Sequence, residues 1–397
     1  MNRFSRVYLQ ITRNTTNLHS TYMSTKVLTS RIFSRSIISL LLFSTMSANV
    51  SFSTSSSTLT LNSLPGGRPI NRTTMSHKQR EGAGFIVTRP FPSRNLDHVG
   101  GTFLMLDHLG PTNYKPGEAV GAPDHPHAGF TTLTYILEGE MEHKDSFGTT
   151  DYLGGKNGGA QYMCAGSGII HSEMPTEAYQ KRGGVMHGFQ LWINLRKEHK
   201  FTKAFYQNVA NDDMPITAVP NSKHDQSISS VRVLVGEYNG VKAKLQPLTN
   251  FSVFDIRLGP TDSVSPPIPN NQIGFVYVYQ GKGLFGPNLG TSGSVGNMVE
   301  LGKPSTIDSN TTPFHISAPS DSELRCLLIY GEPIDEPIAR YGPFVMNTQE
   351  QLKDCFIKYQ NGVFGTIEGA EERQAATKEA IKTQKSAGTW QKDNKDL

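Results

Sequence analysis

The chain has 397 residues, 36% of them apolar, which is enough for two ordinary domains that each bury a core and argues against a single small domain. Its formal net charge is +4, but the first eighty residues carry ten Lys or Arg and no acidic residue, so the remainder is mildly acidic and shows no basic stripe for direct nucleic-acid binding. Three widely separated cysteines, Cys164, Cys326 and Cys355, argue against a disulfide framework or a zinc cluster and indicate a reducing compartment.

Residues 1–80 are predicted to be a disordered leader. Its first 65 residues are basic, Ser-rich and free of acid, a composition typical of a transit peptide for a mitochondrion or plastid. A plain disordered tail, or an extension upstream of a true start at Met46 or Met75, would have the same composition. The one mainly apolar run, Ile38–Phe43, is far shorter than the roughly 18 to 20 residues of a membrane span, so none is expected.

From Gly84 onward, short runs of β-branched and aromatic residues alternate with Gly, Pro and Asn clusters, a spacing typical of an all-β barrel or sandwich. The clearest predicted strands are 131–137, 189–195, 231–235, 251–257, 275–279 and 325–330. Gly139 and Gly281 follow two of these runs in similar settings and suit tight hairpins. This echo, 142 residues apart, indicates a duplicated β unit.

We therefore expect a first domain over 84–200, a polar connection over 201–230 and a second domain over 231–345. Residues 346–397 should form a short C-terminal helix, capped by Thr348, and a tail. Beyond Ile367 there is almost no large apolar residue before Trp390, so this part is expected to be either a surface helix or a frayed tail.

Four side chains in the first domain have the spacing of metal ligands. His125 and His127 stand at i and i+2, so on a strand both point to the same face, and His171 with Glu173 repeats that geometry. Two such pairs on neighbouring strands would converge on one interior point. Pro126, between the first two histidines, cannot donate a ladder hydrogen bond, which predicts that its strand lies at a rim or irregular edge. Three imidazoles and a carboxylate suit Fe, Mn, Ni or Zn better than Ca or Mg. The alternative is that they are unrelated polar residues on a surface loop.

The other candidate ligands are weaker. His143 lies among charges after a hairpin, where it would be either near the site or solvated, and we favour the solvated reading. His108 and His187 are expected to be structural hydrogen bonders, and Cys164 to belong to the core.

At these residues the sequence resembles the pirin family of the cupin superfamily. The similarity lies in APDHPHAGF (122–130), TYILEGE (134–140), AGSGIIHSEMP (165–175), HGFQLWINL (187–195) and GPFVMNTQEQL (342–352). The resemblance implies a bicupin, two jelly-roll barrels of which only the first binds a mononuclear metal, usually iron, through three His and one Glu. Residue by residue, those roles fall on His125, His127, His171 and Glu173.

The sequence departs from the family pattern at three positions near these motifs. Ala128 stands where the family commonly has Arg, Thr131 where it has Glu, and Ser167 where it has Arg. These changes would alter access or partner contacts near the mouth of the site, but they remove no ligand.

The resemblance leaves two functions open. As a quercetin 2,3-dioxygenase, the protein would take a flavonol-like substrate and O2, with Glu173 as a weak ligand and the catalytic proton acceptor. As a non-enzymatic co-regulator in nucleus and cytoplasm, it would contact transcription-factor proteins through a face that responds to the redox state of iron. A storage or signalling bicupin without metal turnover is a third reading, disfavoured because the four ligands are intact. We expect a monomer in each case.

Overall fold

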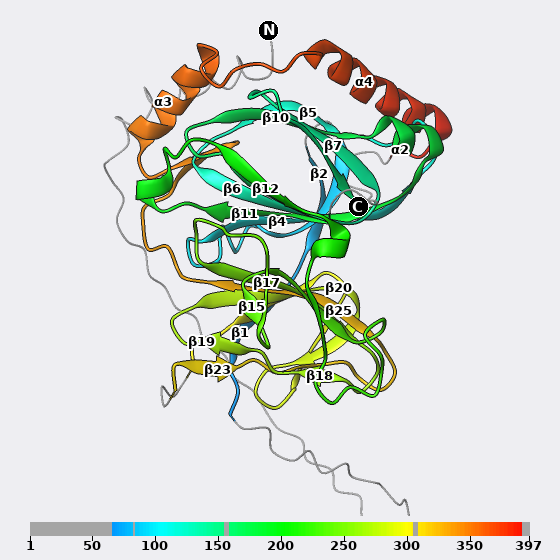
Figure 1. Cartoon of the computed structure of the whole chain (residues 1–397), viewed down its shortest axis with the longest axis vertical. Coiled ribbons are helices and arrows are strands. Elements are labelled where there is room, and N and C mark those ends of the chain that lie inside the picture. Colours follow the sequence, from blue (N-terminus) through cyan, green and yellow to red (C-terminus); the bar gives the residue numbers. More distant parts are fainter. Residues whose placement is uncertain (1–65, 82–83, 155–158, 305–308, 391–397) are drawn as a thin grey trace, which may run out of the picture. The chain divides into compact units, whose positions relative to one another are not determined.

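Strands make up most of the regular structure in the computed structural model, which describes residues 66–81, 84–154, 159–304 and 309–390 (Figure 1). The predicted all-β class is confirmed. Most of the predicted leader, residues 1–65, lies outside the described residues, and so does the transit-peptide hypothesis.

The first barrel consists of a seven-stranded and a four-stranded sheet. The strand orders are β12-β9-β6-β11-β4-β3-β2 and β5-β10-β7-β8, so β5 is an edge strand. A short helix, α2 (Glu177–Arg182), joins β10 to β11, and the 3-10 turn η1 (Lys197–His199) follows β11. The strands are β2 (His77–Glu81), β3 (Phe85–Phe91), β4 (Phe103–Tyr114), β5 (Ala122–His127), β6 (Phe130–Glu138), β7 (Glu140–Asp145), β8 (Thr150–Gly154), β9 (Ala160–Cys164), β10 (Ile169–Pro175), β11 (Gly184–Asn194) and β12 (Phe205–Val209).

The second barrel is built on a ten-stranded sheet in which β1-β22-β20-β25-β17-β14-β13 form the main path and β18, β21 and β24 pair at its side. Two small ribbons, β15 with β16 and β19 with β23, complete it. The strands are β1 (Ile70–Met75), β13 (Ile216–Ala218), β14 (Ser230–Val235), β15 (Glu237–Tyr238), β16 (Val241–Lys242), β17 (Phe251–Leu258), β18 (Ser263–Val264), β19 (Pro267–Pro269), β20 (Ile273–Phe285), β21 (Thr291–Ser294), β22 (Asn297–Leu301), β23 (Thr311–Pro313), β24 (Ile316–Ser317) and β25 (Leu324–Gly331).

A shared apolar core joins strands of the first barrel to strands of the second. Phe103 of β4 meets Phe251 and Phe275 edge to face, with ring centroids 6.2 and 5.7 Å apart. The hydroxyl of Tyr135 on β6 donates to Asp255 of β17 at 2.8 Å. Strands covered on both faces lack a polar face, which explains why the sequence there reads as continuous apolar runs rather than as alternation.

The N-terminal segment contributes to both barrels. β1 pairs with β22 of the second barrel, whereas β2 pairs with β3 of the first. Arg68, which is 1% exposed, donates hydrogen bonds to three carbonyl groups of the second barrel, those of Pro269, Gln272 and Gly302. The prediction of a leader through residue 80 is therefore wrong for its last part. β1 is mostly polar and half-buried, and it is held by backbone pairing, which leaves no hydrophobic pattern in the sequence.

The predicted connection and one predicted turn also need correction. β12 extends the first barrel beside β9, and β13 extends the second beside β14, so residues 201–230 are more than a linker; the 3-10 turn η2 (Asn211–Asp213) lies between these strands. Gly139 separates β6 from β7 with a φ of 98°, as expected of a hairpin. Gly281, however, lies inside β20 next to a shift in register, so it belongs to a bulge.

After β25 the chain returns to the first barrel (Figure 1). A small hairpin, β26 (Ala339–Tyr341) and β27 (Phe344–Met346), precedes helices α3 (Gln349–Gln360) and α4 (Ala370–Ala387). Phe344 packs with Ala128 of the first barrel and with apolar residues of and after α3. The second barrel therefore ends near Gly331 rather than at residue 345, whereas the predicted cap of α3 by Thr348 is confirmed, in a capping box.

Helix α4 resolves the alternative between a surface helix and a frayed tail. Its buried residues are Arg373, Thr377, Ala380 and Gln384, whose spacing puts them on one face. Three of the four are polar, so the docked face gave no amphipathic signal. None of the helices in the described ranges combines the length and the apolar character that a membrane crossing needs.

Candidate metal centre

Two neighbouring strands bring the predicted ligands together. β5 and β10 run antiparallel, with His125 opposite His171 and His127 opposite Ile169. Alternation along β5 turns His125 and His127 to the same side, and Pro126 between them faces away at the sheet edge, as predicted. The pairing shifts between His171 and Glu173, so the strand is irregular where the carboxylate follows the imidazole.

Three imidazoles converge in this place. One ligand atom each from His125, His127 and His171 lies within 4.8 Å of the others. The ring centroid of His125 lies 4.3 Å from that of His171 and 4.8 Å from that of His127. His127 and His171 are buried and His125 is half-buried, so the group has one partly open side.

The hydrogen bonds of these rings fit the needs of a metal ion. His125 donates from Nδ1 to the carbonyl of Pro123 at 2.9 Å, which leaves the lone pair on its Nε2 free. Nε2 of His171 is buried without a hydrogen-bond partner, and so are both ring nitrogens of His127. The backbone of Pro343 raises the pKa of His127, but by less than burial lowers it. Buried nitrogens without partners are costly unless a ligand uses them.

The charge state of the buried rings points the same way. Burial lowers the pKa of His127 and of His171 well below the usual value, and the neighbouring imidazoles lower each pKa further. Both rings are therefore neutral at physiological pH, which is the form that donates a lone pair to a metal. Neutral imidazoles suit Fe, Mn, Ni and Zn.

Glu173 is close by, but its carboxylate is not among the converging ligand atoms. Both of its oxygens accept hydrogen bonds from Nε2 of Gln190 at 3.1 Å, and Oε1 also accepts one from Thr134 at 3.4 Å. Trp192 in turn donates to Oε1 of Gln190 at 3.1 Å, so the carboxylate is held by a chain of contacts from β11. Glu173 as fourth ligand and as catalytic base stays a prediction.

His143 is closer to the centre than the sequence suggested. The favoured reading, a solvated side chain, is wrong because His143 is fully buried. Its Nδ1 lies 3.5 Å from Nδ1 of His171, and it stands opposite Glu173 in the pairing of β7 with β10. A usable signal was present, since His143 and Asp145 stand at i and i+2, as do the other pairs.

The remaining candidates have structural roles. His108 contacts the hydroxyl of Tyr277 at 3.0 Å and Nε2 of His187 at 2.9 Å, which confirms both histidines as hydrogen bonders. Cys164 is buried in the core, as expected. Among the described residues no second group of three His, Cys, Asp or Glu converges in this way.

The departures from the family pattern lie in well-packed surroundings. Ala128 is fully buried under Phe344, and its backbone pairs with the C-terminal hairpin, so a long side chain would displace that hairpin. Thr131 is buried and donates to the carbonyl of Ile193 at 3.2 Å. Ser167 donates its N–H to the carbonyl of Thr202 at 2.8 Å.

The chain folds into two β-barrels. Among the described residues, a three-histidine centre is found only in the first barrel. These features define the class of bicupins with a single candidate metal centre. Two family models match the chain, Pirin over residues 84–193 and the Pirin C-terminal cupin domain over residues 253–365. The chain belongs to the pirin family.

Known relatives span several kingdoms. A pirin-like protein of Arabidopsis thaliana is 37% identical over 71% of this chain and 85% of its own length. A Pseudomonas aeruginosa protein provisionally named quercetin 2,3-dioxygenase is 34% identical over 72% of this chain and 94% of its own, and human pirin is 32% identical over 75% and 94%. The crystal structure of a quercetin 2,3-dioxygenase from Acinetobacter baumannii matches with a TM-score of 0.67 and 29% identity, covering 76% of this chain and all of that one.

Proposed function

We propose that this protein is a quercetin 2,3-dioxygenase-type enzyme that opens a flavonol with O2 at one metal ion, iron being the metal that the family resemblance implies. The observation that carries the proposal is the convergence of three imidazoles, two of them fully buried and neutral, beside the held carboxylate of Glu173. The similarity to a provisionally named quercetin 2,3-dioxygenase of Pseudomonas aeruginosa supports the choice of reaction.

His125, His127 and His171 would hold the ion, since their unpartnered nitrogens need such a ligand. When bound, the ion would supply Lewis acidity and a common binding point for the flavonol hydroxyl and O2. Trp192 and Phe130 lie against His127, with ring centroids 5.1 and 5.0 Å from it, and exclude water from that side.

Glu173 would accept the proton of the flavonol hydroxyl. Gln190 and Thr134 hold its carboxylate in one place, so the base needs no large rearrangement to act. The two hydrogen bonds from Gln190 also keep both carboxylate oxygens away from bulk water, in keeping with the 5% exposure of the residue.

The test is oxygen uptake per bound metal, measured with quercetin and related flavonols. Glu173→Gln keeps the side-chain size but removes the base, so turnover per bound metal should fall by roughly 10² to 10⁴, the usual worth of a general base. Glu177→Gln is the matched control, because that carboxylate lies on the surface in a pair with Lys181. An unchanged turnover per metal in Glu173→Gln would refute the base role.

The alternative is a metal-dependent co-regulator that contacts transcription-factor proteins, and the same assay separates it from the enzyme. A metal-loaded wild-type protein that consumes no oxygen with any flavonol would make the regulator the leading function.

For the compartment, we propose the nucleus and cytoplasm, and the alternative is an organelle reached through the basic leader. Fluorescent tagging at the C-terminus of the whole chain would decide between them.

A further inference from the structure

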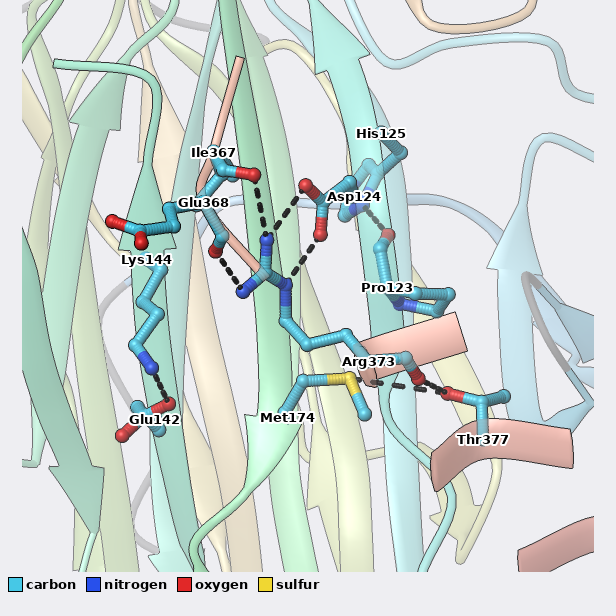
Figure 2. Close-up of polar contacts among 10 residues, drawn as sticks. All are labelled: Pro123, Asp124, His125, Glu142, Lys144, Met174, Ile367, Glu368, Arg373 and Thr377. Carbon is cyan, nitrogen blue, oxygen red and sulfur yellow. Dashed lines mark hydrogen bonds and ion pairs between the residues drawn. The ribbon is translucent and has the colours of Figure 1, made fainter. Parts of the chain in front are cut away.

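The C-terminal helix α4 crosses the strand that carries two of the candidate ligands. Figure 2 shows the guanidinium of Arg373 facing the carboxylate of Asp124, the residue before His125. Nε of Arg373 donates to one oxygen at 2.5 Å and its outer nitrogen donates to the other at 2.8 Å, a two-pronged contact. Residues 366–390 lie beyond the matched family models, which end at residue 365.

Arg373 is itself firmly placed. Its side chain is 10% exposed, and its other donors bond to the carbonyls of Glu368 and Ile367 at 2.8 and 3.3 Å (Figure 2). The pair with Asp124 is thus largely removed from water, and a planar guanidinium holds a carboxylate in both position and orientation. An exposed ion pair would do much less.

Strand β5 depends on such support. It is the edge of its sheet, contains Pro123 and Pro126, and pairs with β10 in an irregular register. A strand with two prolines and a single neighbour has few backbone hydrogen bonds to fix it. His125 also takes its ring orientation from β5, through the carbonyl of Pro123.

Further contacts fasten the rest of the helix to the first barrel. Gln384 donates to the carbonyl of Glu118 at 2.7 Å, and Thr389 donates to the side chain of Glu118 at 2.8 Å. Trp390 stacks under the guanidinium of Arg80, 3.9 Å from the ring centroid. These anchors lie at the far end of α4, so the position of Arg373 is set from both ends of the helix.

We propose that α4 is a positioning element of the metal centre. Through Arg373 and Asp124 it holds β5, and thereby His125, where the ring meets those of His127 and His171. This inference rests on the proposed metal site. Arg373 does not touch the ion or a substrate, and it acts only through the strand.

The test compares full-length variants loaded with Co²⁺, whose visible spectrum reports both binding and coordination. Arg373→Gln should weaken Co²⁺ affinity by roughly 10- to 100-fold, as loss of a partner that orients a ligand usually does, and should change the absorption bands. Arg373→Lys should restore part of the affinity. Lys382→Gln is the matched control on the same helix, because its ion pair with Glu379 is exposed, and its affinity should equal that of wild type.

A second comparison tests the route. Because Arg373 acts through Asp124, the double variant with Asp124→Asn should bind Co²⁺ no more weakly than the poorer single variant. Hydrogen exchange in the metal-free protein should speed up in β5 of Arg373→Gln, while the melting curve stays cooperative. Unchanged affinity and spectrum in folded Arg373→Gln, or additive losses in the double variant, would overturn the inference. His171→Ala that still binds Co²⁺ as wild type does would instead refute the metal site itself.

Discussion

The two barrels share an architecture but differ in what fills them. In the first barrel, strands β5, β7 and β10 bury His127, His143 and His171, with nitrogens that lack partners. In the second, the corresponding interior is a cluster of aliphatic and aromatic side chains, among them Val276, Phe254 and Leu328. The apolar barrel gains stability from its core, whereas the first barrel holds polar groups that stabilise only when a ligand satisfies them.

The largest expected effect tests this difference directly. His171→Ala should lower metal affinity by at least ~100-fold, since even outer partners of metal ligands are worth roughly 10- to 100-fold, while the β fold stays intact. His315→Ala in the second barrel should leave metal content unchanged, because His315 bonds to Ser265 and belongs to no converging group. Metal analysis after dialysis measures both. Loss of metal in His315→Ala would break the comparison.

The second barrel should be the more sensitive to loss of the N-terminal strand. A chain beginning at Met75 lacks Arg68 and most of β1, so it uncovers the edge of β22 and removes the Arg68 donors from three carbonyls, one in a buried and two in partly buried contacts. At about 1 to 3 kcal/mol for each unsatisfied group, the free energy of unfolding should fall by several kcal/mol. Such a chain is therefore not expected to be as stable as the full one. Urea unfolding of both chains, with equal stabilities as the contradicting result, decides it.

A buried lysine offers a smaller test within the first barrel. Lys200 is 1% exposed and donates to the carbonyls of Gly129 and Val345 and to the side chain of Asn194. Lys200→Met keeps most of the side-chain volume but leaves these three acceptors without a donor. We therefore expect a loss of about 2 to 4 kcal/mol in the free energy of unfolding. Lys203→Met, three residues further along the chain and exposed, is the control. A variant as stable as wild type would show that the acceptors find other donors.

The smallest expected effect, counted per pH unit, concerns pH and the contact between the barrels. Burial, aided by His187, lowers the pKa of His108 to about 3. Between pH 6.5 and about 3, His108 is therefore protonated in the unfolded chain but neutral in the folded chain. The contribution of the neutral His108 to the free energy of unfolding is full above pH 6.5 and is lost as the pH falls through that window. The slope should reach at most about 1.4 kcal/mol per pH unit.

His108→Gln isolates that contribution. The metal-free variant should lose stability on acidification less steeply than the metal-free wild type, because the other titrating groups are common to both. Urea unfolding at several pH values between 7 and 4 gives the two slopes. Parallel slopes would mean that His108 has the same pKa in the folded and the unfolded chain, and would refute the prediction.

Local pattern was enough for most strands and for the histidine centre. Runs such as 251–257 and 325–330 are strands in the structure, because β-branched and aromatic residues suit a pleated, buried surface whatever surrounds it. The spacing of His125, His127 and His171 predicted their convergence, since alternation on a strand is a local property. The capped helix after Thr348 was likewise readable from a few neighbouring residues.

Contacts between distant segments decided the rest. β1 lies in the second barrel through backbone pairing that any polar sequence can make, so its residues look like part of a leader. α4 docks through Arg373, Thr377 and Gln384, and polar contacts leave no periodic apolar signal. The burial of His143 and the turn of Glu173 towards Gln190 depend on strands β7 and β11, which approach β10 only in the folded barrel. Side-chain spacing along one strand thus predicts which groups share a face, but which partner each group meets is set by the neighbouring strands, and these come from remote parts of the chain.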